Sequence, residues 1–526
     1  MSLPKPTRGT PSAVGVGRRD HTTVVDAFRD AVNTVPDRIA LRQGEGQLTY
    51  REYGRCVAGL AACLDKAGTA GRPVALVLPN SIEMAVSIFA ALTARTQVAL
   101  FNPAYTAAEL RLLLADAAPA AVVASPGADN ITAALESSEP PALFTLGSAD
   151  LSLDCWRSDP SLDIDNRHRP RANDLATLMY TGGTTGVPKG VIHDHASLMA
   201  TVQAMEACWP TRVDTEVWAT VAPMTHIWGL LMGVLNPVYG RASVVSFPRF
   251  QPGAVIDAME EYKVSVFSGG PAAIYSGLLA APNLASADLR QLRVCPGGGA
   301  PFPPSVLRQW KDATGVEIRE AYGMTEVAPI TGQVPGEEAL AGSVGRPAPH
   351  VEVRIAAEGS QDPQPVNTLG EILVRSPQRM FRGYHRRPED TAKALADGWL
   401  RTGDIGRLDE EGYLYIVDRA KDMILVGGFN VFPREIDEVI ASHPHVAYSV
   451  TIGVPDQRKG EQPISFIVPA AGKSLDVKNI HQHCAQRLAK YKRPTSIIQL
   501  DEIPYTPARK VDRTALRSLF IHQSKP

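Results

Sequence analysis

Short apolar runs alternate with longer amphipathic stretches along the first part of the chain. The runs at 74–78, 98–101, 120–124 and 175–179 predict buried strands, and the helical spacing of apolar residues at 80–94 and 107–117 predicts helices between them. The alternation returns with strands at 217–221, 243–246, 264–267 and 291–294 and an apolar helix at 229–235. Strands that alternate with helices are typical of a parallel sheet covered on both faces. The Asp-, Ser- and Pro-rich stretch 127–172 is expected to be a surface connection.

From residue 351 the period of the apolar positions shifts toward two, at 351–355, 371–374 and 413–417, which predicts short antiparallel strands and a small barrel. The charged segment 418–422 interrupts this pattern. Beyond it, a helix from Pro433, strands at 446–454 and 464–468 and a helix from about Val477 predict a small α+β domain. The predicted class is therefore α/β: a large N-terminal domain of layered α/β sheets plus a small barrel, followed by a small mobile α+β C-terminal domain. The expected boundaries are a loose tail at 1–20, the large domain at 21–418 and the small domain at 419–526.

Composition narrows the possible partners. The chain has 526 residues, more than one ordinary hydrophobic core accommodates, and its formal net charge of −2 gives no general attraction to nucleic acid. No apolar run approaches the roughly 18 residues of a membrane span, and the N-terminal tail lacks the apolar core of a signal peptide. The six cysteines show no CxxC or zinc-ligand spacing, so free thiols in a cytoplasmic protein are expected.

The segment Tyr180-Thr-Gly-Gly-Thr-Thr-Gly-Val-Pro-Lys-Gly190 is the clearest candidate for chemistry. Its glycines allow backbone N–H groups to converge, its threonines add hydroxyl donors and Lys189 adds a positive charge, which together suit phosphate oxygens. The segment is not a Walker A loop, because Val187 and Pro188 separate the last glycine from the lysine. Taken alone, the segment is equally consistent with a flexible polar loop.

Four further clusters are each weak alone. The glycines at 296–301 follow a predicted strand, where α/β sheets bind ligands, although a plain turn has the same composition. The segment 320–326 offers Tyr322 to stack on a base, Thr325 to contact a phosphate and Glu326 to hold Mg²⁺. Asp404 suits two ribose hydroxyls or merely caps a turn. The basic run 506–513 is most often a solvated face in proteins.

In their order and spacing, the segments 180–190, 297–301, 322–326, 402–404 and 418–433, together with Lys510, resemble the ANL superfamily of adenylate-forming enzymes, in its AMP-forming acyl-CoA synthetase type. The resemblance runs from about residue 22 to about residue 519. It implies a two-step reaction with ATP, Mg²⁺ and coenzyme A. A carboxylate attacks the α-phosphorus of ATP to give acyl-AMP and pyrophosphate, and a thiol then displaces AMP.

The resemblance also implies residue roles. Contacts to the β- and γ-phosphates fall to Thr181, Gly182, Gly183, Thr184, Thr185 and Lys189. Adenine contacts fall to Gly299, Ala300, Pro301 and Tyr322, and ribose contacts to Asp404 and Arg419. Catalytic roles fall to Thr325 at the α-phosphate, Glu326 at Mg²⁺ and Lys510 between carboxylate and α-phosphate. Rotation of the small domain about Lys421 would withdraw Lys510 and bring the pantetheine-contacting Gly427, Gly428 and Phe429 to the site.

The acid is expected to be hydrophobic and without an amine, either aryl or medium-chain, because the acidic anchor of amino-acid activators is absent. His226 resembles the aromatic residue near the reacting carboxylate, although a buried capping histidine is the alternative. The predicted acyl pocket comprises His226, Trp228, Ser268, Gly269, Gly270, Gly297 and Gly298.

The sequence departs from the family pattern at two places, of which the second is expected to affect packing only. Arg509 replaces the usual glycine before Lys510, and Arg95-Thr96 replaces a common Gly-Ala pair. The first makes a non-catalytic nucleotide-binding relative a possible alternative. A stand-alone ligase that loads a carrier protein is the other alternative to an acyl-CoA synthetase. The protein is expected to be a monomer or a homodimer.

Overall fold

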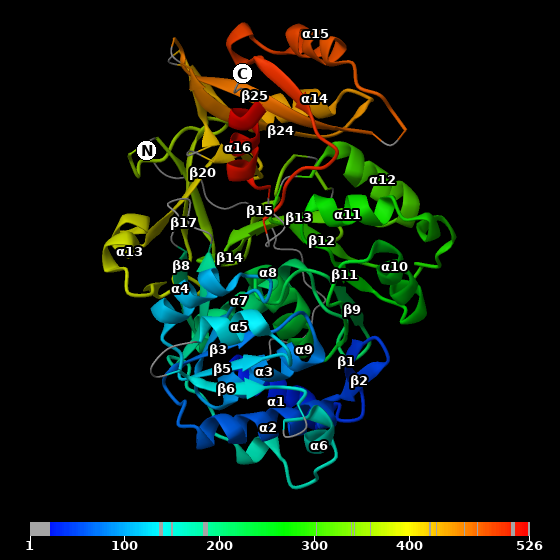
Figure 1. The fold of residues 1–526 in the computed structure, drawn as a ribbon, viewed down its shortest axis with the longest axis vertical. Helices are drawn as coiled ribbons and strands as arrows, with labels where there is room; N and C mark the ends of the chain where they lie inside the picture. Colours follow the sequence, from blue (N-terminus) through cyan, green and yellow to red (C-terminus); the bar gives the residue numbers. More distant parts are fainter. Residues whose placement is uncertain are drawn as a thin grey trace.

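The computed structural model describes residues 21–135, 140–148, 151–181, 188–300, 302–337, 339–340, 342–357, 359–419, 422–427, 429–456, 458–470, 472–506 and 511–523. It confirms the predicted fold class: sheets and helices are layered in a large N-terminal domain, and a separate C-terminal domain follows (Figure 1). In the described part of the chain, no helix is both long and apolar enough to cross a membrane. The expected domain boundaries stay a prediction.

The first sheet of the large domain has seven strands in the order β18-β8-β7-β4-β3-β5-β6. Its strands are β3 (Pro73–Val77), β4 (Gln97–Leu100), β5 (Ala121–Ala124), β6 (Ala142–Thr145), β7 (Leu175–Thr181), β8 (Lys189–Asp194) and β18 (Gly383–Tyr384). Strands β3 to β7 run parallel, and β8 forms an antiparallel hairpin with β7. Strand β6 corrects the expectation that 127–172 is only a connection. It was missed because it is a short edge strand that pairs with β5 alone among the described strands.

The second sheet has five strands in the order β11-β9-β10-β1-β2. Its members are β1 (Ile39–Gln43), β2 (Gly46–Thr49), β9 (Val217–Thr220), β10 (Ser243–Ser246) and β11 (Val266–Ser268). Strands β9, β10 and β11 are parallel and in register, so that Thr220 lies between Ser246 and Ser268. The carboxyl ends of these strands therefore share one edge of the sheet.

Two smaller sheets complete the large domain. The order β12-β13-β14-β15 joins β12 (Cys295–Gly298), β13 (Ile318–Met324), β14 (Val327–Gly332) and β15 (Arg346–Pro347). The strand predicted at 291–294 thus lies further along, over the glycines themselves. A curled antiparallel sheet stands where the small barrel was predicted. It comprises β16 (Glu352–Ala356), β17 (Gly370–Arg375), β19 (Leu395–Ala396), β20 (Trp399–Leu408) and β21 (Leu414–Arg419).

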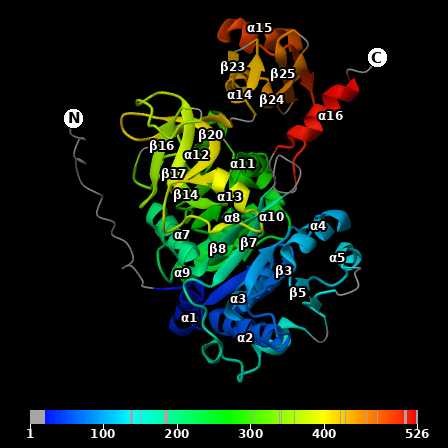
Figure 2. The same ribbon diagram turned by 90° about the vertical axis from the view of Figure 1, so that its left-hand side faces the viewer.

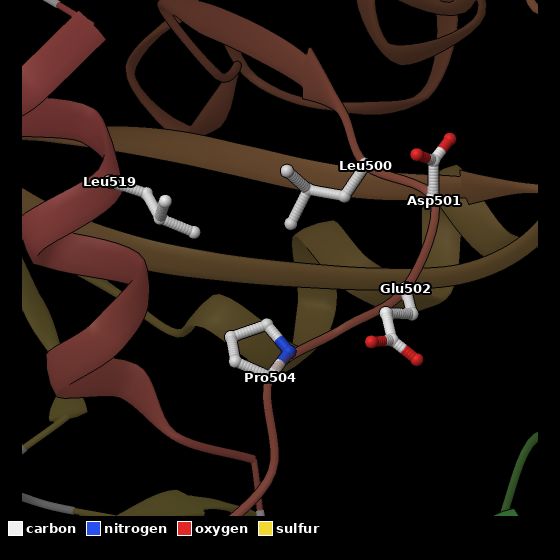
Figure 3. Close-up of a pocket in the computed structure, with 5 residues that line it drawn as sticks. All are labelled: Leu500, Asp501, Glu502, Pro504 and Leu519. Carbon is white, nitrogen blue, oxygen red and sulfur yellow. The ribbon is translucent and has the colours of Figure 1, made fainter.

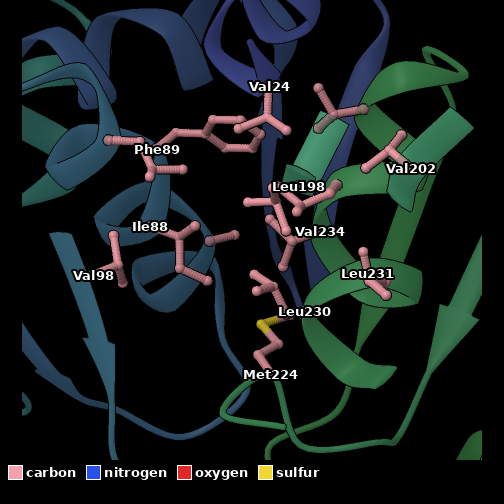
Figure 4. Packing of buried hydrophobic residues seen from close by; sticks show 14 of the residues in the cluster. Val24, Ile88, Phe89, Val98, Leu198, Val202, Met224, Leu230, Leu231 and Val234 are labelled. Atoms are coloured by element: carbon pink, nitrogen blue, oxygen red, sulfur yellow. The ribbon is translucent and has the colours of Figure 1, made fainter. Parts of the chain in front are cut away.

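Helices fill the space between the two large sheets and cover their outer faces. The inner helices are α1 (Val24–Thr34), α2 (Tyr50–Lys66), α3 (Ile82–Thr93), α7 (His195–Cys208), α8 (Ile227–Leu230), the π-helical turn Leu231–Leu235 and α9 (Asn236–Tyr239). Their apolar side chains meet in one core, where Phe89, Leu198 and Leu230 come from three different helices (Figure 4). The outer faces carry α4 (Ala107–Ala117) and α5 (Asp129–Ala134) on the first sheet, and α10 (Pro252–Glu261), α11 (Ala272–Leu279) and α12 (Pro304–Thr314) on the second.

The short peripheral helices are α6 (Leu153–Arg157), α13 (Pro388–Ala394) and the 3₁₀ turns Ile164–Asn166 and Pro282–Ser286.

Local capping fixes where several helices begin. In each of α1, α2 and α4 a threonine hydroxyl accepts from the backbone N–H three residues on, and the acidic side chain there accepts from the backbone N–H of the threonine. This capping box satisfies two otherwise unpaired donors at a helix end. The pairs are Thr23–Asp26, Thr49–Glu52 and Thr106–Glu109.

The C-terminal domain, with the labelled strands β23, β24 and β25, is seen in Figure 2. Its sheet has the order β23-β22-β25-β24, with β26 beside β25. Its strands are β22 (Ile424–Val426), β23 (Phe429–Val431), β24 (Val446–Asp456), β25 (Gly460–Pro469) and β26 (Ser496–Gln499). Its helices are α14 (Pro433–Ala441), α15 (Val477–Arg487) and α16 (Arg513–Gln523), with the 3₁₀ turn Lys490–Lys492. Separate apolar clusters pack on the two faces of this sheet.

A partly buried carboxyl group lies in the large domain where α7 ends. The Glu206 carboxylate accepts from the Thr211 hydroxyl at 2.7 Å, from the Thr211 backbone N–H at 3.0 Å and from the Asn236 amide at 3.4 Å. Burial is the largest influence on its pKa, and it raises that pKa from 4.5 to about 7 despite these hydrogen bonds. The folded protein therefore holds this proton more tightly than the unfolded chain does.

The Glu206→Gln variant should accordingly flatten the pH dependence of stability. Below about pH 4.5 the carboxyl is protonated in both states and imposes no penalty. As the pH rises to about 7, the wild type loses about 3 kcal/mol of unfolding free energy that the glutamine variant keeps. Urea unfolding of both proteins at pH 5 and pH 8 measures this difference. The exposed Glu410→Gln is the matched control, and equal pH slopes for Glu206→Gln and the wild type would contradict the burial argument.

Candidate active site

The β7–β8 hairpin holds the two ends of the predicted phosphate loop together. Thr181, the last residue of β7, pairs in register with Lys189, the first residue of β8. The Lys189 ammonium lies 3.4 Å from the Asp390 carboxylate and 5.1 Å from the centre of the Tyr384 ring. The loop residues Gly182, Gly183, Thr184 and Thr185 lie outside the described residues. Their phosphate role stays a prediction.

Tyr384 connects the predicted phosphate lysine to the predicted metal ligand. Its hydroxyl donates to the Glu326 carboxylate at 2.7 Å, while its ring faces Lys189. Burial and the neighbouring Glu326 raise the pKa of Tyr384, so the phenol keeps its proton at neutral pH and remains a donor. The sequence analysis missed Tyr384 and Asp390. No sequence motif marked them, since β18 brings Tyr384 to this place only by pairing with β8.

Glu326 has the chemistry of a Mg²⁺ ligand. Its side chain is 6% exposed, and the Tyr384 hydroxyl orients one of its carboxylate oxygens. Among the described residues, no group of three or more His, Cys, Asp or Glu side chains is placed to hold a metal ion. Mg²⁺ characteristically uses one or two carboxylates plus substrate phosphates, so a single buried carboxylate beside a phosphate loop fits this ion.

Thr325 is held in place by a histidine on the neighbouring strand. His193 Nε2 lies 2.7 Å from the Thr325 carbonyl oxygen, and because a carbonyl only accepts, Nε2 carries the proton. Complete burial lowers the pKa of His193, so the imidazole is neutral at pH 7. The β8 strand therefore fixes the backbone of the residue that is predicted to contact the α-phosphate.

The predicted adenine and ribose residues meet at a second buried carboxylate. The Tyr322 hydroxyl donates to Asp404 Oδ2 at 2.5 Å, and Arg419 Nε lies 3.1 Å from Asp404 Oδ1. Asp404 is 5% exposed, and its backbone N–H donates to the Thr402 hydroxyl at 3.0 Å. Burial and the neighbouring Asp404 raise the pKa of Tyr322 far above its ordinary value, so the phenol stays a donor. The fold thus brings together Tyr322, Asp404 and Arg419 from three strands.

The glycine segment lies beside this group. A Cβ on Gly298 would lie 2.6 Å from the Ala321 carbonyl oxygen, so only glycine fits there. Gly299 has a φ of +85°, and a Cβ there would meet nothing within 4 Å. Open space beside Gly299 is consistent with its predicted adenine contact, whereas Pro301 lies outside the described residues.

At the predicted acyl pocket, His226 begins helix α8. Its Nδ1 accepts from the Trp228 backbone N–H at 3.3 Å, which is the capping contact weighed as the alternative role. A Cβ added to Gly270 would lie 3.7 Å from the Trp228 ring, so the indole lies close to Gly270.

Two of the predicted pocket glycines serve packing. A Cβ on Gly269 would lie 2.7 Å from the Tyr275 ring, and one on Gly297 would lie 2.6 Å from the Phe302 ring. Any side chain at either position would enter this aromatic cluster, so these glycines make room for core rings. Gly269 and Gly297 can therefore line the predicted acyl pocket only with backbone atoms.

Part of the C-terminal machinery lies outside the described residues, namely Lys421, Gly428 and Lys510. Gly427 has a φ of +59° with open space around it, and the exposed Phe429 stacks on Tyr491 with ring centres 4.6 Å apart. At the junction, the Asp418 carboxylate accepts from the backbone N–H of Arg434 at 3.0 Å, in the first turn of α14. This contact joins the last strand of the large domain to the small domain.

A surface pocket of about 450 Å³ lies elsewhere on the C-terminal domain. It is lined by Leu500, Asp501, Glu502, Pro504 and Leu519, between the segment after β26 and helix α16 (Figure 3). None of the predicted site residues lines it.

A layered α/β domain, a separate α+β domain, and Tyr322 at the end of β13 followed by Thr325 and Glu326 in the turn before β14 are together typical of the adenylate-forming class of ligase. The family model described as AMP-binding enzyme matches residues 28–385, and the model described as AMP-binding enzyme C-terminal domain matches residues 435–510. The chain belongs to the AMP-binding enzyme family, and it is an AMP-forming acid–thiol ligase that uses ATP and Mg²⁺.

Similar proteins cover nearly the whole chain. A long-chain-fatty-acid–CoA ligase of Bacillus subtilis is 31% identical over 529 residues, covering 94% of each chain. A feruloyl-CoA synthase of an Amycolatopsis species is 35% identical over 491 residues, covering 92% of this chain and 96% of the relative. The crystal structure of ATP-bound MatB from Rhodopseudomonas palustris matches with a TM-score of 0.88 at 30% identity, over 96% of this chain and 100% of that one.

The Tyr384→Phe variant tests whether the tyrosine orients the metal ligand. Without its hydroxyl, Glu326 loses a 2.7 Å hydrogen bond and its carboxylate is less well oriented. We expect the Mg²⁺ concentration that gives half-maximal pyrophosphate release to rise about tenfold, the usual cost of losing a partner that orients a metal ligand. The control is Tyr262→Phe, a tyrosine at the end of α10. An unchanged Mg²⁺ dependence in Tyr384→Phe would exclude the proposed link.

Proposed function

We propose that this enzyme activates a hydrophobic carboxylic acid without an amine, aryl or medium-chain, as acyl-AMP and joins the acyl group to coenzyme A. The observation that supports this best is the stretch 322–326. Within five residues, Tyr322 reaches the Asp404–Arg419 pair and Glu326 reaches the Tyr384–Lys189 pair. A nucleotide that lies along the stretch 322–326 would have its ribose near Tyr322 and its phosphates near Glu326.

The residues would act mainly by positioning and charge. Lys189 and the loop N–H groups would hold the β- and γ-phosphates, so that pyrophosphate leaves as an already stabilised anion. Thr325 would contact the α-phosphate, where negative charge increases during attack by the carboxylate. Glu326 would hold Mg²⁺, which neutralises phosphate charge when bound. Preorganised cations and donors of this kind stabilise the transition state more than the ground state.

The ribose end would fix the other half of the nucleotide. Asp404 has two oxygens, one facing Tyr322 and one facing Arg419. A carboxylate held in this way keeps acceptor capacity for ribose hydroxyls, and Arg419 is 52% exposed in its side chain, so it can reach a ligand. Adenine would lie against the open backbone at Gly299 and Ala300.

The identity of the acid rests on the apolar surroundings of its predicted site. Trp228 and Gly270 lie beside each other at the start of α8 and the end of β11. Among the relatives, one is named for long-chain fatty acids and another for a feruloyl substrate. Both names denote acids with a large apolar part, which supports a hydrophobic acid here.

The second step would use the C-terminal domain in another orientation. Rotation about Lys421 would withdraw Lys510 and bring Gly427, Gly428 and Phe429 to the acyl-AMP. The Asp418–Arg434 contact would have to break in this rotation, because its partners lie on opposite sides of the hinge residue. The Arg434 guanidinium also donates to the Ile416 carbonyl across the same hinge, so the rotation would break both hydrogen bonds, each of modest net strength.

The proposed function is tested by a screen for pyrophosphate release over carboxylic acids, with and without coenzyme A. We expect release with at least one aryl or medium-chain acid, and an acyl-CoA product when coenzyme A is present. Thioester formation only on a phosphopantetheinylated carrier protein would identify the carrier-loading alternative. Absence of pyrophosphate release with every acid would favour the non-catalytic alternative suggested by Arg509.

The Lys510→Ala variant tests the assignment of the two steps. Removing a cation that bridges the carboxylate and the α-phosphate should slow acyl-AMP formation by about a hundredfold or more. The conversion of added acyl-AMP to acyl-CoA should change little, because Lys510 is withdrawn in that step. Lys473→Ala, at the only Gly-Lys-Ser of the chain, is the control. Equal losses in both steps would contradict the separate roles.

A further inference from the structure

Three hydroxyl groups form a row across the second sheet, at the carboxyl ends of its parallel strands. Ser246 on β10 and Ser268 on β11 are both in register with Thr220 on β9, the strand between them. Each is the last residue of its strand. In-register residues of neighbouring parallel strands point to the same face of a sheet, so the three side chains share one face.

That face is the one covered by the helix that begins at His226. The alternate residues Ala219, Val245 and Phe267 pack into the outer apolar cluster, whereas Trp218, Val244 and Val266 pack into the inner core. The hydroxyl row, two positions beyond this second set, therefore faces inward. A Cβ on Gly233 would lie 2.9 Å from the Thr220 methyl carbon, which places the π-helical turn Leu231–Leu235 against the row.

The three hydroxyls are buried without hydrogen-bond partners. Thr220 and Ser268 are 0% exposed and Ser246 is 4% exposed, and none of their oxygens has a partner among the described residues. The great majority of buried polar groups are paired, since an unpaired one loses its hydration without compensation. Three such groups side by side lower the stability of the fold. Their presence therefore needs an explanation other than stability.

The row continues toward the predicted acid site. Gly270 follows Ser268 by two residues, and Trp228 lies close to Gly270. The Trp228 indole nitrogen is also buried, and it too lacks a hydrogen-bond partner in the described part of the chain. Unpaired donors thus extend from the start of α8 to the ends of β9, β10 and β11.

We propose that Thr220, Ser246 and Ser268 bind a neutral oxygen substituent on the acid, remote from its carboxylate, such as a hydroxyl, methoxy or keto group. Hydroxyls both donate and accept, and they carry no charge, so they suit an uncharged oxygen. This inference rests on the proposed function and specifies its substrate further. A site built to hydrogen-bond a substrate oxygen rejects the analogue that lacks it, because the buried groups of the protein are then left unpaired.

The test compares matched acids in the full-length wild type: cinnamate with 4-hydroxycinnamate and 4-methoxycinnamate, and octanoate with 8-hydroxyoctanoate. At least one oxygenated acid should exceed its parent about tenfold or more in kcat/KM for pyrophosphate release. The aromatic and alkyl pairs distinguish a ring substituent from a chain hydroxyl. If the parent acids react as well as or better than every oxygenated one, the inference is wrong while the ligase function stands. If no acid reacts, both fail.

Variants then locate the recognition. Thr220→Val and Ser268→Ala preserve shape, and each should lower kcat/KM for the oxygenated acid about tenfold more than it lowers kcat/KM for the parent acid. A purely structural role would instead lower both rates, or thermal stability alone, and leave the ratio unchanged. Ser243→Ala is the matched control, because this β10 hydroxyl already donates to the Ile39 carbonyl at 2.5 Å. A preference that persists in the Thr220 and Ser268 variants would overturn the assignment.

Discussion

The hydrogen bond from Tyr322 to Asp404 joins two sheets of the large domain. Tyr322 belongs to β13, beside the glycine strand, whereas Asp404 belongs to β20 of the curled antiparallel sheet. A carboxylate that is 5% exposed is stable only with partners, which here are the phenol and Arg419. Gly298 pairs with Ala321, the residue before Tyr322, so the start of the glycine segment lies beside this bond and the predicted nucleotide end of the site depends on it.

A second contact of this kind lies at the end of the site that is predicted to bind the phosphates. Strand β18 leaves the curled-sheet region and pairs with β8, the strand that follows the phosphate loop. This pairing brings Tyr384 between Lys189 and Glu326. Both ends of the site therefore consist of a tyrosine that donates to a buried carboxylate across two sheets. Each buried carboxylate would be left with one hydrogen bond fewer if it lost its tyrosine, so the two hydrogen bonds favour this arrangement of the side chains.

The sequence predicted what is local or periodic and missed what depends on tertiary pairing. Alternation predicted the layered class and most strands and helices, and the spaced motifs pointed to the family. The edge strand Ala142–Thr145 was missed because one short run between polar segments carries no periodicity. Tyr384 and Asp390 were missed because their positions follow from β18 pairing with β8, and no local motif encodes that pairing. The strand at Cys295–Gly298 was placed too early, since glycine-rich sequences are read as turns.

The glycines near the acid show why small residues alone do not define a pocket. Gly269 and Gly297 are small because aromatic rings occupy the space that their side chains would take, whereas a Cβ on Gly270 would make only ordinary contacts. The sequence predicted a hydrophobic acid in a pocket lined largely by these small residues. The structure places packed rings on one side of β11 and, on the other, the Ser268 hydroxyl, which has no hydrogen-bond partner among the described residues. The strand alternation that builds the core thus also determines which side chains are available to an acid, so specificity follows from register more than from residue size.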